Sequence, residues 1–544
     1  MAPDLRRRII RFALLILPLS SWLLTAMYLS GTSPRSVNWL LVSHWLRATP
    51  QHTGLLAALA AGVVLSFLLA FSLKKISKSE GFDGAGYKRY IRGTQVVSFK
   101  RLTHLCVERN KRQVEIAGVP MPTSVENLHV LLNGATGSGK SVLLRPLIYS
   151  ALKRGDRAVI VDPNGDLYSK FGRSDDVLLN PYDERTQKWM YFNEVRADFD
   201  WKRLVYSIVP LGVDANAEEW NSFGRLLLSA VSRKLFEMNV HDIDQVNYWC
   251  CEAPFKEIQA FLKGTEAQSL FAGASESTRA FDSARFVLSN KLSEHRAMPA
   301  GGFSIRDWME HGRGSLYITW REDMKTAMKP LLSAWVDIFC SSILSMPESA
   351  VRRWWLVIDE LASLEKLASL VDVLTKGRKH GVRVVAGLQA VSQLAAIYGK
   401  DMAQTLRACF RNLVVLGGSK TDAETAKEMS TALGEHEVAR PEYTDSRNPG
   451  GSRGTSERLV RQTEPVVTPA QIQALAALTG YVAFAEDRPI AKFVLKPISF
   501  ITKNPPFIER SDISVGRASN TSWGPEDGTT PWSLNDLPAD TTQG

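Results

Sequence analysis

Residues 134–141 read Gly-Ala-Thr-Gly-Ser-Gly-Lys-Ser, a stretch that fits the motif G-x-x-x-x-G-K-[ST]. The apolar run at 128–132 before it is typical of a buried strand, and Val142 opens a pattern typical of a helix. Because glycine has no Cβ, a loop this rich in glycine can turn successive backbone N–H groups toward a phosphate. The alternative is a glycine-rich turn that binds nothing. The stretch predicts a strand, a phosphate-binding loop and a helix.

This loop has the side chains needed to bind a nucleoside triphosphate and its metal. Lys140 can reach the β- and γ-phosphates, which makes it a catalytic as well as a binding residue, and the Ser141 hydroxyl can ligate Mg²⁺. The predicted nucleotide-binding residues are Gly134, Ala135, Thr136, Gly137, Ser138, Gly139, Lys140 and Ser141.

An acidic pair follows a second apolar run. The run at 354–358 reads as a strand that ends in Asp359 and Glu360, and we expect it beside the strand that carries the loop. The Asp359 carboxylate would hold Mg²⁺, directly or through water. Glu360 would orient and deprotonate the attacking water, a step that separates a hydrolase from a protein that only binds nucleotide. A solvated turn is the alternative, and the upstream lysine favours the catalytic interpretation.

Gln389 ends the next apolar run, at 382–388. An amide at the carboxyl edge of a parallel sheet can contact both the attacking water and the γ-phosphate, and so report whether that phosphate is present. A surface glutamine without such a role is the alternative. Gln389 is therefore the candidate γ-phosphate sensor.

Basic residues cluster just before that run. The cluster consists of Arg378, Lys379, His380 and Arg383. A cation supplied by a neighbouring subunit can neutralise charge in the transition state of phosphoryl transfer, and Arg378 is the first candidate for that role. A solvated basic turn explains the same cluster equally well.

The chain is too long for one hydrophobic core, and it is basic. Its 544 residues indicate two or three folding units besides any membrane segment. The formal net charge of +10 suits a partner with a phosphate backbone or an anionic membrane face, without identifying either. The five cysteines show no metal-ligand spacing, and a disulfide framework is not expected in a chain this large, so the main body suits a reducing cytoplasm.

Two apolar stretches near the N-terminus approach the length of a membrane-spanning helix. They cover about 12–30 and 54–73, with arginines ahead of the first and lysines after the second. Positive charge on both outer flanks predicts a transmembrane hairpin with both ends in the cytoplasm. A cleaved signal peptide and a pair of buried soluble helices are the alternatives. No small-residue cleavage site stands out near Ser30, and the flanking charges argue against buried helices.

Short apolar runs rich in β-branched residues recur along the rest of the chain. Helical patterns separate most of them, which is typical of a parallel sheet covered on both faces and hence of the α/β class. The runs lie at 128–133, 158–161, 177–179, 315–318, 355–358, 382–385, 413–416 and 481–484. Between about 183 and 307 the pattern is helical, which predicts an all-α domain inserted between two strands.

These patterns predict an order of domains. Residues 444–462 and the C-terminal tail are rich in glycine, serine, proline and charge, which indicates mobile segments. We expect a transmembrane hairpin at 1–78, a β-rich lead-in at 79–127, a nucleotide-binding domain at 128–182 and 308–508, an all-α domain at 183–307 and a disordered tail at 509–544.

Several segments, taken in order, resemble the conjugative type IV coupling proteins of the TraD/TrwB group. The phosphate loop and the acidic pair are common to many NTPases, whereas the order, the spacing and the segments Asp-Pro-Asn-Gly-Asp and Gly-Arg-Lys-His-Gly are specific. The likeness extends from the N-terminus to about Pro497. The segments that carry it are 116–122, 129–141, 161–167, 357–361, 377–382 and 387–389.

The resemblance implies an inner-membrane, multi-pass, RecA-like P-loop ATPase that assembles as a homohexamer around a central channel. It implies that ATP and Mg²⁺ are bound, that DNA is bound with little sequence specificity, and that DNA stimulates hydrolysis. The implied partners are the relaxase with its relaxosome and the inner-membrane components of a type IV secretion channel, during bacterial conjugation. Residue by residue, it assigns phosphate binding to Lys140, Mg²⁺ ligation to Ser141 and Asp359, water activation to Glu360, γ-phosphate sensing to Gln389 and the in-trans arginine to Arg378.

Other functions fit parts of this pattern. A docking receptor whose nucleotide only sets assembly would not need the Glu360 carboxylate for transfer. A DNA translocase of the FtsK type usually has more membrane spans and a C-terminal winged-helix reader, which nothing after Phe507 can form. An ABC transporter would carry a Leu-Ser-Gly-Gly-Gln signature between the two phosphate motifs, and the sequence has none there.

Overall fold

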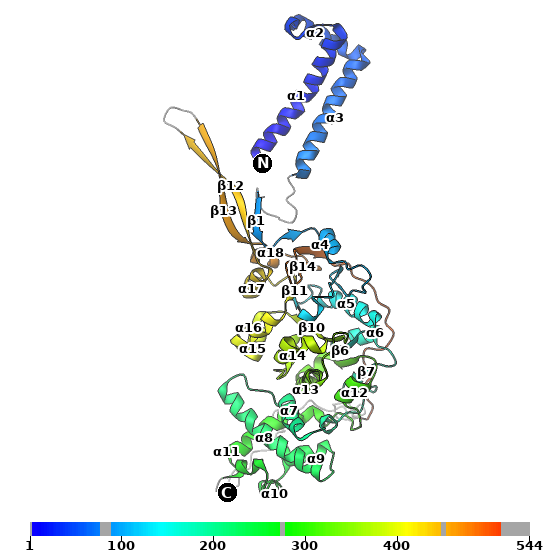
Figure 1. The fold of residues 1–544 in the computed structure, drawn as a ribbon, viewed down its shortest axis with the longest axis vertical. Coiled ribbons are helices and arrows are strands. Elements are labelled where there is room, and N and C mark those ends of the chain that lie inside the picture. Colours follow the sequence, from blue (N-terminus) through cyan, green and yellow to red (C-terminus); the bar gives the residue numbers. More distant parts are fainter. Residues whose placement is uncertain (1–2, 77–88, 273–277, 448–452, 513–544) are drawn as a thin grey trace, which may run out of the picture. The chain divides into compact units, whose positions relative to one another are not determined.

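The computed structural model describes residues 3–76, 89–272, 278–447 and 453–512, which form two compact units (Figure 1). The first unit comprises the described residues within Met1–Val161, Gly212–Ala217 and Phe339–Phe500, and the second comprises those within Asp162–Leu211, Glu218–Ile338 and Ile501–Gly544. The expected disordered tail at 509–544 falls, from 513 onward, outside the described residues.

The sheet of the first unit carries the phosphate loop on a central strand. Its strands, in spatial order, are β2 (Val96–Val97), β15 (Ile490–Val494), β14 (Thr479–Ala483), β11 (Asn412–Leu416), β5 (Val130–Asn133), β10 (Val382–Leu388), β9 (Trp354–Ile358) and β6 (Arg157–Pro163). The strands from β11 to β6 are parallel to one another and almost wholly buried. The expected α/β class with buried parallel strands is confirmed for this part.

The expectation of a parallel sheet is wrong beyond β11. There β14 runs antiparallel to both β11 and β15. The link from β14 to β15 is a short turn rather than a helical crossover, and only antiparallel strands can be joined so closely. The sheet is therefore mixed.

Helices connect these strands and bury apolar faces. Helix α5 buries Leu144, Leu147, Ile148 and Ala151, which recur at helical spacing and so form one stripe. The helix ends where Gly155 adopts a left-handed conformation, φ 96°. The helices that lie wholly in this unit after residue 76 are α4 (Phe99–Cys106), α5 (Lys140–Arg154), α14 (Leu370–Lys376), α15 (Val391–Tyr398), α16 (Lys400–Cys409), α17 (Ala423–Leu433) and α18 (Pro469–Gln473).

Two small sheets lie outside the main one. In the first, β3 (Glu115–Ile116) and β4 (Val119–Pro120) are joined by Ala117 and Gly118, both with positive φ, as a two-residue hairpin turn requires. In the second, the order is β1 (Arg89–Gly93), β12 (Glu435–Arg447) and β13 (Arg453–Pro465).

Of the segment at 444–462 that was expected to be mobile, residues 448–452 lie outside the described residues, and the residues on either side belong to strands β12 and β13. They pair antiparallel in one continuous register, from Glu435 opposite Pro465 to Arg447 opposite Arg453. The sequence at 444–462 has few apolar residues and lacks the alternation that indicates a strand, so it resembles a loop.

The second unit is mainly helical. Strands β7 (Val177–Leu179) and β8 (Leu316–Trp320) pair in parallel, and between 183 and 307 the described residues form helices, turns and isolated bridges. Helices with most of their residues in this unit are α6 (Asp166–Phe171), α7 (Asp198–Ile208), α8 (Ala215–Glu237), α9 (Ile243–Asn247), α10 (Phe255–Phe261), α11 (Arg279–Leu292), α12 (Ile305–His311) and α13 (Lys325–Ser345).

Two buried carboxylates hold helix starts in the second unit. Asp162 accepts hydrogen bonds from the backbone N–H groups of Leu167 and Tyr168, at 3.0 and 2.8 Å. Glu194 accepts from the backbone N–H of Ile305 at 2.7 Å, and burial raises the pKa of its carboxyl. Both side chains satisfy helix-terminal N–H groups that would otherwise lack partners.

The N-terminal segment folds into two long helices and a short one. Figure 1 shows α1 (Pro3–Ser30) and α3 (Thr53–Ile76) side by side, with α2 (Trp39–Ala48) across their common end. The Ser21 hydroxyl donates to the Ala58 carbonyl at 2.8 Å. A Cβ added to Gly62 would come within 2.6 Å of the Pro18 Cα, so only glycine allows α1 and α3 this close approach.

Length and composition alone do not establish membrane spans in these helices. Among the described residues, Glu322–Ser345 is the one helix long and apolar enough, and it is 78% buried within the protein, as a core helix is. Trp39–Gln51 and Thr53–Leu68 pass the same test only as a pair, bent by 95°. Ile16–Ser30 is a shorter apolar helix. The transmembrane hairpin stays a prediction.

Candidate nucleotide-binding site

The phosphate loop occupies the turn between β5 and α5, as its sequence predicts. Backbone hydrogen bonds fix it: Gly134 donates to the Leu388 carbonyl at 3.1 Å, and Ala135 donates to the Gly417 carbonyl at 3.0 Å. Gly139 has φ 114°, and a Cβ there would lie 2.8 Å from the Leu478 Cδ2. Glycine is required at this position both for the backbone conformation and for the space.

Lys140 lies at the centre of the site. Its Nζ donates to the Gly134 carbonyl at 2.8 Å and lies 3.6 Å from a Glu360 carboxylate oxygen. Burial lowers the pKa of Lys140, and the nearby Glu360 and Asp359 carboxylates oppose that shift. A cation held in a poorly solvated loop by one carbonyl and nearby acids is arranged to pair with a phosphate.

Ser141 and Asp359 form the second part of the site. The Ser141 hydroxyl donates to an Asp359 carboxylate oxygen at 3.4 Å. Neighbouring oxygens on one octahedral Mg²⁺ lie roughly 3 Å apart, because each bond is about 2.1 Å long, so the two oxygens fit a shared ion. In the described part of the chain no three His, Cys, Asp or Glu side chains gather into a metal cluster. Mg²⁺ with few protein ligands suits such a site.

The strand that carries the acidic pair is not the immediate neighbour of β5. The order is β5, β10, β9, so β10 lies between the loop and Asp359. A Cβ at Gly387 would come within 1.8 Å of the Asp359 carbonyl oxygen. Glycine at 387 therefore lets β10 pass close to the end of β9, and Ser141 reaches Asp359 beyond it.

Glu360 and Gln389 lie at the same edge of the sheet as the loop. The Glu360 side chain is 13% exposed, beside Lys140. The Thr136 hydroxyl donates to the Gln389 side-chain oxygen at 3.1 Å. Gln389 follows β10, the strand next to β5, which brings it to the loop.

Arg378 is the one predicted catalytic residue placed away from this group. It precedes β10, whereas the loop follows β5, and the two strands are parallel. Arg378 therefore lies near the opposite edge of the sheet. The seven residues of β10 between the two edges span roughly 20 Å, at about 3.3 Å a residue.

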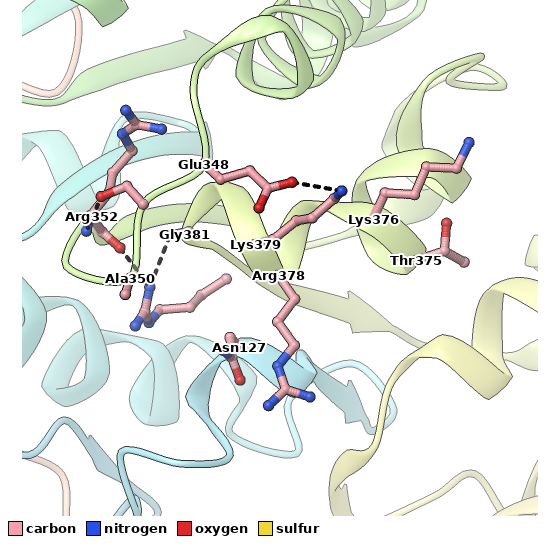
Figure 2. Close-up of a pocket in the computed structure, with 11 residues that line it drawn as sticks. Asn127, Glu348, Ala350, Arg352, Thr375, Lys376, Arg378, Lys379 and Gly381 are labelled. Atoms are coloured by element: carbon pink, nitrogen blue, oxygen red, sulfur yellow. Dashed lines mark hydrogen bonds and ion pairs between the residues drawn. The ribbon is translucent and has the colours of Figure 1, made fainter.

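Arg378 lines a pocket of about 720 Å³. Its lining includes the cations Arg352, Lys376, Arg378, Lys379 and Arg383 and the acid Glu348. Figure 2 shows the Glu348–Lys379 ion pair, 2.7 Å, and the Arg378 guanidinium extending away from it. Lys376 pairs with Asp372 at 2.6 Å. Within the described residues, no hydrogen bond or ion pair engages the Arg378 side chain, which leaves its charge available to a partner.

Two members of the basic cluster are structural. The buried Arg383 donates to a Glu126 carboxylate oxygen at 3.0 Å, and Glu126 also binds Arg154. His380 bonds through Nδ1 to the Met346 carbonyl at 2.8 Å. These contacts occupy both side chains, so Arg378 is the better candidate for a contact outside the chain.

The structure also brings to the loop residues that the sequence did not indicate. Leu478, at φ 63°, donates its N–H to the Ser138 carbonyl at 3.0 Å, and Leu495 donates to the Leu478 carbonyl at 2.7 Å. Leu478 immediately precedes β14 and Leu495 immediately follows β15, far along the chain from the loop. Their leucines carry no chemical signature, so only the folded sheet reveals this contact.

With this geometry established, comparison with known proteins identifies the family. The model of the type IV secretion-system coupling protein DNA-binding domain matches residues 113–496. The chain belongs to this family. Its recognition from sequence motifs is confirmed.

Relatives of this family agree with the fold. The conjugative coupling protein TrwBΔN70, unbound, is 55% identical with a TM-score of 0.75, covering 79% of this chain and 99% of that one. TrwB in complex with ADP and Mg²⁺ is 55% identical with a TM-score of 0.74, covering 79% and 100%. These neighbours and the mixed sheet fit a RecA-like NTPase.

A curated relative extends beyond this chain. Coupling protein TraD of Escherichia coli (strain K12) is 30% identical over 418 residues. The match covers 73% of this chain and 56% of TraD, so this chain spans about half the length of that relative.

Proposed function

We propose that this protein is an inner-membrane, DNA-dependent ATPase that couples a relaxase–DNA complex to a type IV secretion channel and pumps DNA during conjugation. The observation that carries the proposal is the group formed by Lys140, Ser141, Asp359 and Glu360 at the carboxyl edge of the sheet. Membership of the coupling-protein family and 55% identity to TrwB, solved with ADP and Mg²⁺, support it. The proposed assembly is a homohexamer, with partners in the relaxosome and in the inner-membrane part of the channel.

The proposed reaction assigns one task to each side chain. The loop N–H groups and Lys140 bind the β- and γ-phosphates of ATP. Ser141 and Asp359 hold Mg²⁺, which supplies neutralising charge to the phosphate oxygens when bound. Glu360 accepts a proton from the water that attacks the γ-phosphorus, while the bond to the β–γ bridging oxygen breaks and ADP and phosphate form. Gln389 contacts that water and the γ-phosphate.

DNA should stimulate the ATPase. Because binding without sequence preference rests on phosphate contacts, we expect single- or double-stranded DNA to raise the rate several-fold at low salt. The stimulation should fall steeply as salt rises from about 50 to 200 mM, and DNAs of unrelated sequence should act alike. The measurement is steady-state phosphate release by the detergent-solubilised chain. An ATPase rate that ignores DNA at low salt would refute DNA dependence.

Arg378 is the proposed in-trans residue. It lies at the edge of the sheet opposite to the loop, so it cannot reach the nucleotide of its own subunit. In a closed ring, that edge can face the loop of the next subunit. An arginine from a neighbouring subunit can stabilise the negative charge of the transferring phosphoryl group.

Replacing Arg378 with alanine should lower the ATPase rate of the assembled protein by about 10³-fold, because an in-trans arginine typically contributes at least that much. Lys379→Ala, one residue away on the same turn, is the matched control and should retain most of the rate. Mixing Arg378→Ala with Lys140→Ala subunits should restore part of the activity, since some interfaces then combine an intact loop with an intact Arg378. A mixture as inactive as its components would contradict an in-trans role.

The transmembrane hairpin is part of the same proposal. Large apolar side chains of α1 and α3 are exposed in the chain alone, among them Leu24 (64%), Phe67 (65%) and Leu68 (58%). Such exposure is costly in water and expected in lipid. With positive charge at both outer flanks, we propose that both termini are cytoplasmic and that the link from α1 to α3 lies outside.

A further inference from the structure

The short helix α2 is set nearly at a right angle to its neighbour. The bend between Trp39–Gln51 and Thr53–Leu68 is 95°. Figure 1 shows α2 lying across the end that α1 and α3 share. A helix at a right angle to one that crosses a membrane lies parallel to the membrane plane.

The inner side of α2 is fixed to the hairpin. Trp45 is 6% exposed and belongs to a buried cluster with Trp22, Ala26 and Leu55. The Trp22 indole N–H donates to the Thr49 hydroxyl at 2.9 Å, just past the end of α2. These contacts set the rotation of α2 about its axis, and so decide which residues face outward.

The outer side of α2 carries large apolar side chains. Trp39 is 78% exposed, Leu40 is 76% exposed and Leu46 is 52% exposed. Arg47 lies on the same exposed side, in the last turn. A tryptophan, leucines and one long cationic side chain form the composition typical of a helix at a membrane–water boundary.

We propose that α2 is an interfacial helix that lies in the headgroup–acyl boundary of the outer leaflet. The inference rests on the proposed transmembrane hairpin. Large side chains are also exposed on α1 and α3 near the end that α2 crosses, where Tyr28 is 86% exposed and Leu56 is 48% exposed. Trp39 and Leu40 enter the upper acyl region, and the Arg47 guanidinium reaches lipid phosphates. The helix thereby fixes the depth of both spans.

Cysteine labelling from outside the cell tests the depth of α2. The variants are Trp39→Cys and Leu40→Cys, with Ser33→Cys, in the exposed loop before α2, as the matched control. Sealed spheroplasts that carry the full chain, with the outer membrane removed, receive a membrane-impermeant maleimide, and peptide mass reports the reaction at each cysteine. We expect Ser33→Cys to react readily, and Trp39→Cys and Leu40→Cys to react at least about 10-fold more slowly. The same rates are measured on purified protein in lipid nanodiscs without any partner.

Three other labelling results would contradict either the position of α2 or the topology of the hairpin. Equal rates at 33 and 39 would place α2 in water and overturn this inference, while the hairpin would stand. Slow reaction at 39 in spheroplasts but fast reaction in nanodiscs would mean that another protein covers α2, and would also overturn it. If Ser33→Cys fails to react in sealed spheroplasts but reacts in opened ones, the proposed topology itself is wrong.

Discussion

Replacing Lys140 with alanine should abolish ATP turnover and, with it, plasmid transfer. The Lys140 Nζ lies in the phosphate loop, where it donates to the Gly134 carbonyl and lies 3.6 Å from a Glu360 carboxylate oxygen. A unit charge about 4 Å from a phosphate contributes about 4 kcal/mol at an effective dielectric constant of 20, which corresponds to roughly three orders of magnitude in rate. The measurements are phosphate release and a mating assay in a deletion strain complemented by either form.

The fold should survive this substitution. Burial disfavours the charged form of Lys140 and so lowers the pKa of its amine. We therefore do not expect the charge of Lys140 to contribute to the free energy of unfolding. Lys153→Ala is the matched control, because Lys153 lies exposed on the same helix, with its Nζ 5.6 Å from the centre of the Tyr149 ring. The control should hydrolyse ATP and support transfer at the normal rate. Transfer at the normal rate by Lys140→Ala would remove hydrolysis from the mechanism.

Much of the first unit could be predicted from the sequence because its strands are buried on both faces. The run at β9 is continuously apolar and the run at β10 is apolar apart from Arg383, and their ends carry the residues that meet at the edge of the sheet. For parallel strands, the carboxyl ends lie together whatever the order, which is why Lys140, Glu360 and Gln389 converge as the motifs indicate.

The order of strands and the solvated elements could not be predicted in this way. Adjacent apolar runs do not reveal that β10 lies between β5 and β9, because each interior strand offers the same buried surface to either neighbour. Residues 444–462 include few apolar side chains, so the paired strands β12 and β13 have a loop-like sequence there. Leu478 reaches the phosphate loop through a backbone N–H, which every residue except proline has.

Replacing Glu360 with glutamine should separate binding from hydrolysis. The amide keeps the size of the side chain but cannot accept a proton, so we expect the hydrolysis rate to fall by about 10²–10⁴-fold. Binding of ATP should be retained or tightened, because the carboxylate that now lies 3.6 Å from the Lys140 Nζ no longer competes with a phosphate for that cation. Single-turnover hydrolysis and retention of labelled ATP measure the two effects separately.

The same variant distinguishes a motor from a receptor. A protein that uses nucleotide only to set its assembly would still support transfer when it binds ATP without splitting it, whereas a motor would stall with ATP bound. Glu115→Gln, an exposed acid on β3, is the control for loss of one negative charge and should behave as the unchanged protein. Normal plasmid transfer by Glu360→Gln, with ATP bound and no hydrolysis, would establish the receptor and refute the pump, because DNA movement against resistance requires the γ-phosphate bond to be broken in each cycle.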